Sequence, residues 1–372
     1  MNKNLLKIYG VDASEMKGAP REVFLPESVE EVCDIVRKNE RIVIRGGATG
    51  LVGGCVPQNG VDVVLDLSKM NEISNLNVEH ELVEVEAGVV LDELQNYLGE
   101  FDLEFPIKPS SHAVCTVGGM ISTDAVGNHA VKYGKTSNWV KWIEIVDCYG
   151  KVYRKGITEL SDYSGMEGIT GVIVRACLKL SKIRERTGTL LEFKTIEELV
   201  DAVRELKRNR FVSMLEFIDR GISDKLGLGM EYHLIVEYED GSGELSGSGY
   251  QDLLDKRDNI APLLSGEGYH RIEDPKVLLD RSISLIKWCE ENKIPVFGHI
   301  GVGIFHPRFN QDKEKLIPEM MKIVKRLGGQ ISGEHGIGVL KKAFVDANDK
   351  KILVNVKKRT DVLNKFNIGK VV

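Results

Sequence analysis

The chain has 372 residues, enough for two or three domains that each bury a hydrophobic core. Lys and Arg number 50 against 56 Asp and Glu, a net charge of -6, which excludes a generally basic nucleic-acid-binding protein. No run of about 18 apolar residues is present, so we expect no integral membrane segment. The first residues lack the apolar stretch of about 7–15 residues that a secretory signal requires, so the cytoplasm is the expected compartment.

Cysteine spacing argues against a zinc ribbon or an iron–sulfur cluster within the chain. The six cysteines are scattered and include no Cys-x-x-Cys pair, so we expect reduced thiols. Glycine is the unusual residue, because 38 of 372 residues is about 10%, against an average near 7%. Since the excess gathers in a few segments, those segments are the first candidates for function.

The first half of the chain predicts a helix followed by buried strands. Ser28 and Glu31 form a capping box, which predicts a helix over residues 27–40. Apolar runs predict strands at residues 41–45, 61–67, 82–87, 142–147 and 171–180. The glycine-rich loop 46–54 joins the first of these strands to the second.

The character of the sequence changes near residue 182, where we place a domain boundary. Thr195 and Glu198 form a second capping box, which starts an amphipathic helix. Further strands and helices are predicted at 214–219, 232–239, 250–260, 276–292 and 294–300. Residues 241–249, rich in glycine and serine, predict a flexible loop. This mixture of strands and helices is typical of a compact α+β domain.

Two standard nucleotide-binding motifs are missing. No Gly-x-Gly-x-x-Gly occurs, so the Rossmann fingerprint fails. Residues 134–136 resemble the end of a P-loop, but His129 stands where that motif needs glycine. Three glycine-rich segments remain, at 46–54, 110–119 and 165–171, and each taken singly is more often a structural turn. Together they indicate backbone amides that converge on an extended diphosphate.

These segments resemble a known family. The series RGGATGLVGG, TVGGMISTDAVG, KYGKTSNWVKWIEIVDCYGKV and GMEGITGVIVRACLKL is similar, in residues and in order, to the FAD-binding domain of the vanillyl-alcohol oxidase superfamily. The branch it resembles contains D-lactate dehydrogenase, D-2-hydroxyglutarate dehydrogenase and the D subunit of glycolate oxidase. The resemblance implies an α+β fold with a PCMH-type FAD-binding domain at 1–183. It also implies an inserted, ferredoxin-like α+β substrate or cap domain at 184–328, and a C-terminal segment at 329–372 that returns to the flavin.

By this resemblance the expected cofactor is non-covalent FAD. Some relatives attach the flavin to a histidine in the first glycine loop, where this chain has Ala48, which cannot form that bond. The first two glycine-rich segments are expected to hold the pyrophosphate and flank the isoalloxazine, while the third lies on the adenine side. The expected FAD contacts are Gly46, Gly47, Ala48, Thr49, Gly50, Leu51, Pro109, Ser110, Ser111, Cys115, Thr116, Gly118, Gly119, Ile121, Ser122, Glu167, Gly168, Ile173 and Asn367.

A second group of candidate residues contains two histidines and a glutamate. His299 and His306 lie in GHIGVGIFH, at an odd separation that places side chains on opposite faces of a regular strand, although the glycines between them permit a bend. Glu334 and His335 are adjacent in GEHGIG. Two imidazoles and one carboxylate leave coordination positions open, as in a catalytic zinc site. The residues alone leave ordinary core or surface histidines as the alternative.

The resemblance implies a role for each of these residues. In metal-dependent members of the branch, the residues that match His299, His306 and Glu334 bind a divalent metal, with zinc as the first candidate here. His335 is the expected base for the hydroxyl proton, and Arg257 is expected to pair with the substrate carboxylate, with a solvated helix face as its alternative. A metal lowers the pKa of bound water from about 15.7 to about 7 and acidifies a hydroxyl in the same direction, while hydride passes to flavin N5.

The chain departs from the family pattern near these residues. Val302 and Ile304 stand where relatives usually carry Asp and Asn, and Val126 stands where relatives carry the glycine of a Thr-Asn-Ala-Gly run. The expected activity is oxidation of a small D-2-hydroxy acid, of the lactate, glycolate or 2-hydroxyglutarate class, to the 2-oxo acid. Two alternatives stay open: a catalytically silent FAD-binding subunit of a redox complex, and a zinc hydrolase.

No motif identifies the electron acceptor. A quinone, an electron-transfer flavoprotein, a cytochrome, oxygen and an iron–sulfur partner subunit all stay open. The lysine-rich stretch 341–359 is a candidate for docking on a membrane surface or on an electron-accepting partner, with a solvated helix face as the alternative.

Overall fold

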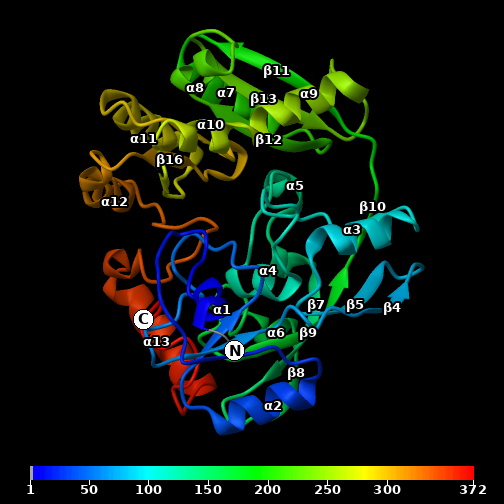
Figure 1. Ribbon diagram of the computed structural model, residues 1–372. Coiled ribbons are helices and arrows are strands. Elements are labelled where there is room, and N and C mark those ends of the chain that lie inside the picture. The colour runs from blue at the N-terminus through cyan, green and yellow to red at the C-terminus, as the bar shows by residue number, and fades with distance from the viewer. Residues whose placement is uncertain (1–2) are drawn as a thin grey trace. The chain divides into compact units, whose positions relative to one another are not determined.

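The computed structural model describes residues 3–372, and the chain divides into two compact units (Figure 1). Unit 1 contains the described residues up to 125, residues 135–183 and residues 335–372. Unit 2 contains residues 126–134 and 184–334. The last passage between the units therefore falls between Glu334 and His335.

Unit 1 is built on two larger sheets and one small one. Its helices are α1 (Lys3–Ile8), α2 (Val29–Lys38), α3 (Leu91–Gly99), α4 (Val117–Thr123), η1 (Thr136–Trp139), α6 (Ile157–Leu160), η4 (Lys342–Phe344) and α13 (Ala347–Thr360). Its strands are β1 (Glu22–Phe24), β2 (Ile42–Arg45), β3 (Val63–Asp66), β4 (Ile73–Asn77), β5 (Leu82–Glu86), β6 (Leu103–Glu104), β7 (Val140–Val146), β8 (Val152–Gly156), β9 (Val172–Lys179) and β10 (Ser181–Lys182). A parallel sheet has the order β1-β3-β2, an antiparallel sheet has the order β4-β5-β9-β7-β8, and β10 pairs with β6.

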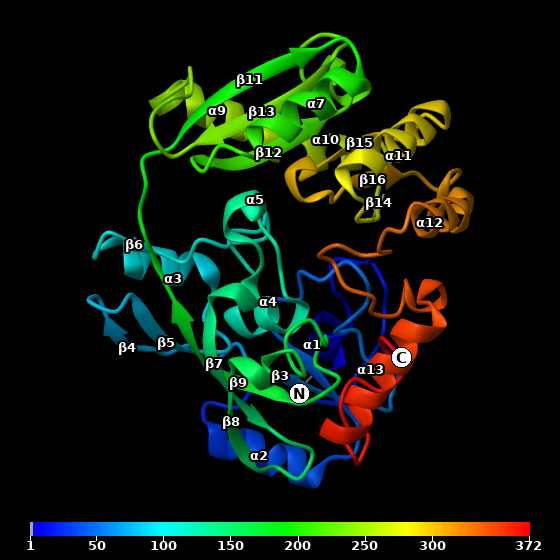
Figure 2. The ribbon, with the colours of Figure 1, turned by 180° about the vertical axis from the view of Figure 1, so that it is seen from behind.

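The C-terminal residues complete the core of unit 1. Helix α2 starts at the predicted cap, where the Ser28 hydroxyl accepts from the N–H of Glu31 at 3.2 Å. Its apolar face packs with β2, β3, β9 and the buried ring of Phe366. Phe366 forms a parallel bridge with Ile42 of β2, so the end of the chain runs beside the first strand of the glycine loop. Figure 2 shows the red α13 and the C-terminus beside elements from the N-terminal half of this unit.

Unit 2 is built on one six-stranded antiparallel sheet with the order β11-β13-β12-β15-β16-β14. Its strands are β11 (Thr187–Phe193), β12 (Val212–Ile218), β13 (Tyr232–Tyr238), β14 (Arg271–Ile272), β15 (Val296–Gly298) and β16 (His306–Phe309). Its helices are α5 (Ala130–Tyr133), α7 (Ile196–Leu206), α8 (Arg220–Lys225), α9 (Gly247–Asp258), α10 (Ile260–Gly266), α11 (Leu279–Glu291), η2 (Ile300–Val302), η3 (Glu314–Leu316) and α12 (Ile317–Arg326). Helices α8, α9 and α10 pack their apolar residues on β12, β13 and β15, so every residue of β12 is buried.

Two of the predicted segments were wrong in part. Residues 241–249 are not wholly a flexible loop, because Leu245 exchanges two backbone hydrogen bonds with Gly188 and α9 begins at Gly247. The helix predicted from residue 276 begins at Leu279, because the residues before it pair with other strands: the Lys276 N–H donates to the Gln330 carbonyl at 2.9 Å. Both errors come from long-range backbone pairing, which overrides the local pattern.

The expected mixture of helices and sheets is confirmed, while the finer domain limits stay predictions. All six cysteines are free thiols, as expected. Among helices within residues 3–372, none combines the length and the apolar character that a bilayer crossing needs.

Candidate active site

The first two glycine-rich segments of unit 1 lie in contact. A Cβ atom on Gly46 would lie 2.3 Å from the Thr116 hydroxyl oxygen, and one on Gly47 would lie 2.1 Å from the Val114 carbonyl oxygen. Both distances are far too short for real atoms, so the contact requires glycine. The structure therefore brings together the two segments that were predicted to hold a pyrophosphate from both sides, and FAD contact itself stays a prediction.

The backbone of these two segments has special local geometry. Ala48 has a left-handed φ of 55°, a conformation that is uncommon outside glycine. Thr116 caps α4, and its hydroxyl accepts from the N–H of Gly119 at 3.3 Å. A Cβ on Gly118 would lie 2.6 Å from that of Ala87, which lets α4 pack closely on the chain that follows β5. The non-covalent mode of FAD attachment stays a prediction.

Glu167 and Asn367 connect the third glycine-rich segment to the C-terminal residues of unit 1. The Glu167 carboxylate accepts from the backbone N–H groups of Ile337 at 2.7 Å and Gly338 at 2.9 Å. The side-chain amide of Asn367 donates to the Glu167 carbonyl at 2.7 Å and accepts from the N–H of Ile44 at 3.2 Å. Both side chains are buried. Glu167 fixes the turn that follows His335, and Asn367 ties the backbone of Glu167 to β2. The expected contact of both residues with FAD stays a prediction.

The other expected FAD contacts belong to the same unit. They are Thr49, Gly50 and Leu51 in the first loop, Pro109, Ser110, Ser111 and Cys115 before α4, Ile121 and Ser122 within it, Gly168 in the turn before β9, and Ile173 in β9. Residues 46–51 are all partly buried, and Arg45 just before them is buried. All expected flavin-binding residues therefore lie in unit 1.

In unit 2, the structure brings His299, His306 and Glu334 together into what we call the cage. Strands β15 and β16 are antiparallel neighbours, and the chain bends between them through η2 and Gly303, whose φ is 75°. The His299 Nε2 atom lies 3.5 Å from one oxygen of Glu334, and the His306 Nε2 atom lies 3.3 Å from the other. One ligand atom from each residue lies within 4.8 Å of the others. The bend that the sequence permitted is present.

A buried carboxylate fixes the backbone at Glu334. Asp274, which is fully buried, accepts from the N–H groups of Gly333 at 2.9 Å and Glu334 at 2.7 Å. The same carboxylate accepts from the Ser332 hydroxyl at 2.9 Å. These hydrogen bonds hold the backbone of Glu334 in place, and its side chain extends from there to the two imidazoles.

A second buried carboxylate holds His299. Glu216, in β12, is 1% exposed, and one of its oxygens contacts the Nδ1 atom of His299. Its other oxygen accepts from the Nε and Nη2 atoms of Arg257, both at 2.9 Å. Arg257 is itself buried, so a solvated helix face is wrong for this residue. Its expected contact with a substrate carboxylate stays a prediction.

The charges around His299 explain its protonation. Burial by itself raises the pKa of Glu216, but the His299 imidazole and the Arg257 guanidinium lower that pKa to about 2. The ionised carboxylate can only accept, so His299 carries a hydrogen on Nδ1 and turns Nε2 toward Glu334. Burial lowers the pKa of His299, but the carboxylates of Glu216 and Glu334 raise it to about 9. The cage therefore favours a positive charge.

The cage residues fit a divalent metal. Two imidazole nitrogens and a carboxylate are the donor set of several catalytic zinc sites, which keep a position open for water or substrate. A carboxylate behind a ligating imidazole is the usual support for such a ligand, and Glu216 has that position behind His299. The residues expected to be ligands are thus together, and metal binding itself is a proposal taken up below.

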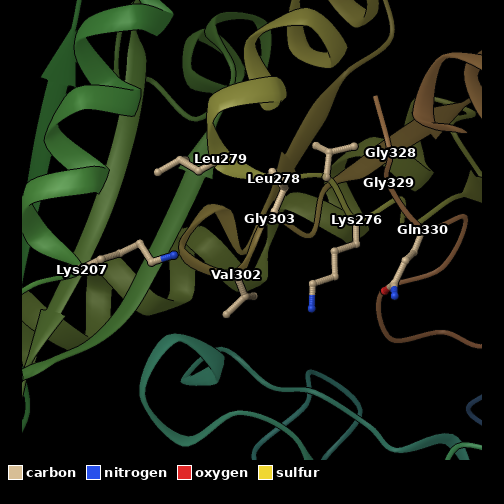
Figure 3. A pocket seen from close by; sticks show the side chains of 10 residues that line it. Lys207, Lys276, Leu278, Leu279, Val302, Gly303, Gly328, Gly329 and Gln330 are labelled. Carbon is tan, nitrogen blue, oxygen red and sulfur yellow. The ribbon is translucent and has the colours of Figure 1, made fainter. Parts of the chain in front are cut away.

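The residues that depart from the family pattern, Val126, Val302 and Ile304, pack against one another. Val302 and Ile304 pack in one apolar cluster with Val126 and Ala130, from the segment that carries α5. Val302 also lines a cavity of about 270 Å³ in unit 2, together with Lys207 and Lys276 (Figure 3). The apolar residues at 126, 302 and 304 therefore form one packed cluster with each other.

Sequence reasoning missed a second buried cluster in unit 2, which joins α5 to β13. Glu237 is fully buried, and its side chain contacts Ser213, Tyr250, His129 and Arg186. The hydroxyl of Ser213 donates to its carboxylate at 2.5 Å, and the Nε2 atom of His129 lies 3.0 Å from it. Glu239 accepts from the Tyr133 hydroxyl at 2.6 Å and pairs with Lys132. A buried charge within the apolar run 232–239 was the available sequence signal.

Comparisons with known proteins identify the family of this chain. The FAD binding domain family matches residues 20–156, and the C-terminal domain family of FAD linked oxidases matches residues 272–371. The chain is 30% identical to a D-lactate dehydrogenase of Archaeoglobus fulgidus, over 98% of this chain and 95% of that protein. It is 26% identical to a D-2-hydroxyglutarate dehydrogenase of Xanthomonas citri pv. viticola, over 88% and 83% of the two chains.

A third relative has a different name and similar coverage. The chain is 25% identical to the glycolate oxidase subunit GlcD of Bacillus subtilis, over 98% of this chain and 91% of that protein. The first family model falls mainly in unit 1, and the second covers residues 272–334 of unit 2 and nearly all of the C-terminal part of unit 1. The chain therefore belongs to the FAD-linked oxidases, an enzyme family whose members include these D-lactate and D-2-hydroxyglutarate dehydrogenases.

Proposed function

We propose that this chain oxidises a small D-2-hydroxy acid to the 2-oxo acid, with FAD bound non-covalently by unit 1 and a divalent metal held by the cage. Zinc is the first candidate for that metal. The observation that carries the proposal is the convergence of His299, His306 and Glu334 in a chain of the FAD-linked oxidases. Relatives named for D-lactate, D-2-hydroxyglutarate and glycolate support the 2-hydroxy acid class.

The reaction removes a proton from the hydroxyl oxygen and a hydride from Cα. When bound, the metal would lower the pKa of a hydroxyl oxygen, and FAD would accept the hydride at N5. The imidazoles of His299 and His306 and the Glu334 carboxylate bind and orient the cation, because their donor atoms already face a common point. Asp274 and Glu216 hold two of these three residues in place.

His335 takes the hydroxyl proton in this proposal. Imidazole is the side chain that serves most often as a general base in enzymes. His335 directly follows the ligand Glu334, so the Cα atoms of ligand and base are about 3.8 Å apart. The Glu167 carboxylate restrains the turn after it through two backbone N–H groups. The proposal requires that a substrate bound at the cage reach the flavin held by unit 1.

Two other functions compete with this one. A catalytically silent FAD-binding subunit was favoured by Val302 and Ile304, but these residues pack with Val126, and the three cage residues and His335 are all present. A zinc hydrolase would use the cage without a flavin, and membership of the FAD-linked oxidases supports the oxidation instead. Within residues 3–372, no residue identifies the electron acceptor, and we propose none.

Flavin bleaching under anaerobic conditions tests the proposal. The protein as purified is expected to show a flavin spectrum, which bleaches with at least one of D-lactate, D-2-hydroxyglutarate and glycolate and not with L-lactate. His335→Ala should keep FAD and lose bleaching, while His80→Ala, at an exposed turn, should behave as the wild type. A colourless protein would support the hydrolase. Failure of a broad 2-hydroxy acid panel with bound FAD would support the silent subunit.

A further inference from the structure

Arg308 lies on the same strand and the same face as the cage residue His306. Both belong to β16, and residues two apart on a strand point to the same side, with Cα atoms about 6.6 Å apart. In the register of β15 and β16, His306 is opposite Phe297, whose ring packs with apolar residues of α9 and α10. The Arg308 side chain therefore extends, beside His306, into the layer between the sheet and these two helices.

Helix α10 holds one nitrogen of the Arg308 guanidinium. The Nη2 atom donates to the Ser265 hydroxyl at 2.6 Å and to the Ala261 carbonyl at 3.4 Å. Both hydrogen bonds go to uncharged groups. They fix the position of the guanidinium and leave its charge without a counterion.

Each histidine of the cage has a buried guanidinium nearby, and the two guanidinium groups come from different elements. Arg257, from α9, contacts the carboxylate of Glu216 that holds His299. Arg308 follows His306 by two residues on β16. In the sheet, β15 lies between β12, which carries Glu216, and β16. The cage therefore has one cationic side chain toward β12 and another along β16.

The two guanidinium groups differ in their charge balance. Arg257 pairs with the carboxylates of Glu216 and Asp258. Among the residues that the structure describes, Arg308 has no carboxylate partner, and its buried Nε atom has no hydrogen-bond partner. Arg308 is only 5% exposed, so its charge has lost most of its contact with water. A buried charge of this kind is costly unless an opposite charge compensates it, and an acidic ligand would supply that charge.

We propose that Arg308 binds a second carboxylate of the substrate, so that the enzyme prefers a dicarboxylic D-2-hydroxy acid to a monocarboxylic one. The hydroxyl and the carboxylate next to it keep the places that the proposed function gives them, at the cage and at Arg257. The far carboxylate lies beside His306, where the N–H groups of the planar guanidinium can hold it. The inference rests on the proposed function and narrows its substrate class, since the relatives are named for both monocarboxylic and dicarboxylic acids.

A matched pair of substrates tests the proposal. D-2-hydroxyglutarate and D-2-hydroxypentanoate have the same chain length and differ at one end, where a carboxylate replaces a methyl group. In anaerobic flavin bleaching, the wild type should show a second-order rate constant about 10–150-fold higher for the diacid, because hydrogen bonds to a charged group have that effect on binding.

Variants at Arg308 separate this preference from other causes. Arg308→Gln should lose it, through a lower rate constant for the diacid and an unchanged one for the monoacid. Arg308→Lys keeps the charge but not the planar fork, and should retain part of the preference. Arg208→Gln, which changes an arginine of the same unit with a 71% exposed side chain, is the control and should match the wild type.

Binding without turnover gives a second readout. Calorimetric titration with the products, 2-oxoglutarate and 2-oxopentanoate, should show the same preference in the wild type and its loss in Arg308→Gln. Equal rate constants for the two hydroxy acids in the wild type would overturn the inference and leave the proposed function standing, and so would a diacid preference that survives in Arg308→Gln. If no 2-hydroxy acid reduces the flavin of the wild type, the proposed function fails and the inference fails with it. The comparison of the two substrates in the wild type carries the test if Arg308→Gln does not fold.

Discussion

Unit 2 contains two buried glutamate–histidine pairs, whose glutamates lie on the neighbouring strands β12 and β13, and only one pair belongs to a candidate active site. Glu216 with His299 and Glu237 with His129 are alike in burial, at 1% and 0% exposure of the two carboxylic residues. They are alike in charge too, because burial raises each glutamate pKa while the neighbouring histidine and other donors lower it to about 2. Burial and a displaced pKa therefore do not by themselves mark a site.

The two pairs differ in what their neighbours offer. Glu237 is surrounded by groups that donate: a serine hydroxyl, a tyrosine hydroxyl, an imidazole and a guanidinium. Such a network satisfies its carboxylate within the chain and ties α5 to the sheet. At the cage, by contrast, two imidazole Nε2 atoms and one carboxylate, each a group that can bind a divalent metal, lie close together. A cluster of groups that can all ligate a cation distinguishes this site from the structural network.

The largest expected effect comes from the cage carboxylate. Glu334→Gln removes a charged donor, so metal content should fall to background and flavin reduction by substrate should slow by about 1,000-fold or more, since several kcal/mol of charge stabilisation are lost. Metal analysis and anaerobic stopped-flow spectroscopy measure the two effects. FAD content should not change. A Glu334→Gln protein with wild-type metal content would remove the distinction drawn between the two clusters.

Glu237→Gln should lower the stability of the protein and leave metal binding unchanged. Breaking one partner of a buried charged network costs about 3–5 kcal/mol in the free energy of unfolding, because the remaining charges keep their desolvation penalty. Urea unfolding measures this loss, while metal content and Zn²⁺ affinity should match the wild type. Loss of metal without loss of stability would place Glu237 in the metal site and not in a structural clamp.

The stabilisation that Glu237 provides should depend on pH. Its pKa is lowered in the folded chain to about 2, below the unfolded value near 4.3, so its stabilisation is present above about pH 4.3 and is lost as pH falls toward 2. The difference in unfolding free energy between the wild type and Glu237→Gln should therefore be full at pH 7 and shrink by about 2–3 kcal/mol toward pH 2. If the difference in unfolding free energy between the two proteins grows as the pH falls, Glu237 is not a charged residue that stabilises the fold.

The smallest effect tests the apolar cluster beside the cage. Ile304→Asn restores the residue type that relatives carry, but it places an amide against Val126 and Ala130, at an expected cost of about 1–3 kcal/mol in stability. In a Val126→Gly background the same change should cost less, with a coupling of about 0.5–3 kcal/mol. Thermal unfolding of the single and double variants gives this coupling. Strictly additive costs would show that residues 126 and 304 do not interact.

The parts of the candidate site that are marked by short local motifs were predicted from the sequence, and the parts that depend on distant contacts were not. The glycine loops and the segments around His299 and Glu334 are visible because residue type and short spacing carry their chemistry. Glu216 was not predicted to support a ligand, since its partner lies 83 positions away and is set by strand register. A single acidic residue within the apolar strand of residues 212–218 was the signal that could have drawn attention to it.

Long-range pairing also limited the prediction of the fold. Asp274 anchors the backbone of Glu334 from 60 positions away, and no periodicity reveals such a contact. Residues 126–134 belong to unit 2 although both of their flanks belong to unit 1, a passage that local patterns do not show. Strands with strong apolar runs were predicted, whereas β11 was not, because it follows directly on a polar stretch.

Metal removal and return, followed through the flavin colour, tests the central claim most directly. FAD-loaded protein is stripped with a chelator, mixed anaerobically with the substrate that bleaches the untreated enzyme, and then titrated with Zn²⁺, Mn²⁺ or Co²⁺. The account predicts no rapid bleaching in stripped protein and a rate that rises to a plateau at one metal ion per chain. Bleaching at the full rate in stripped protein would contradict it.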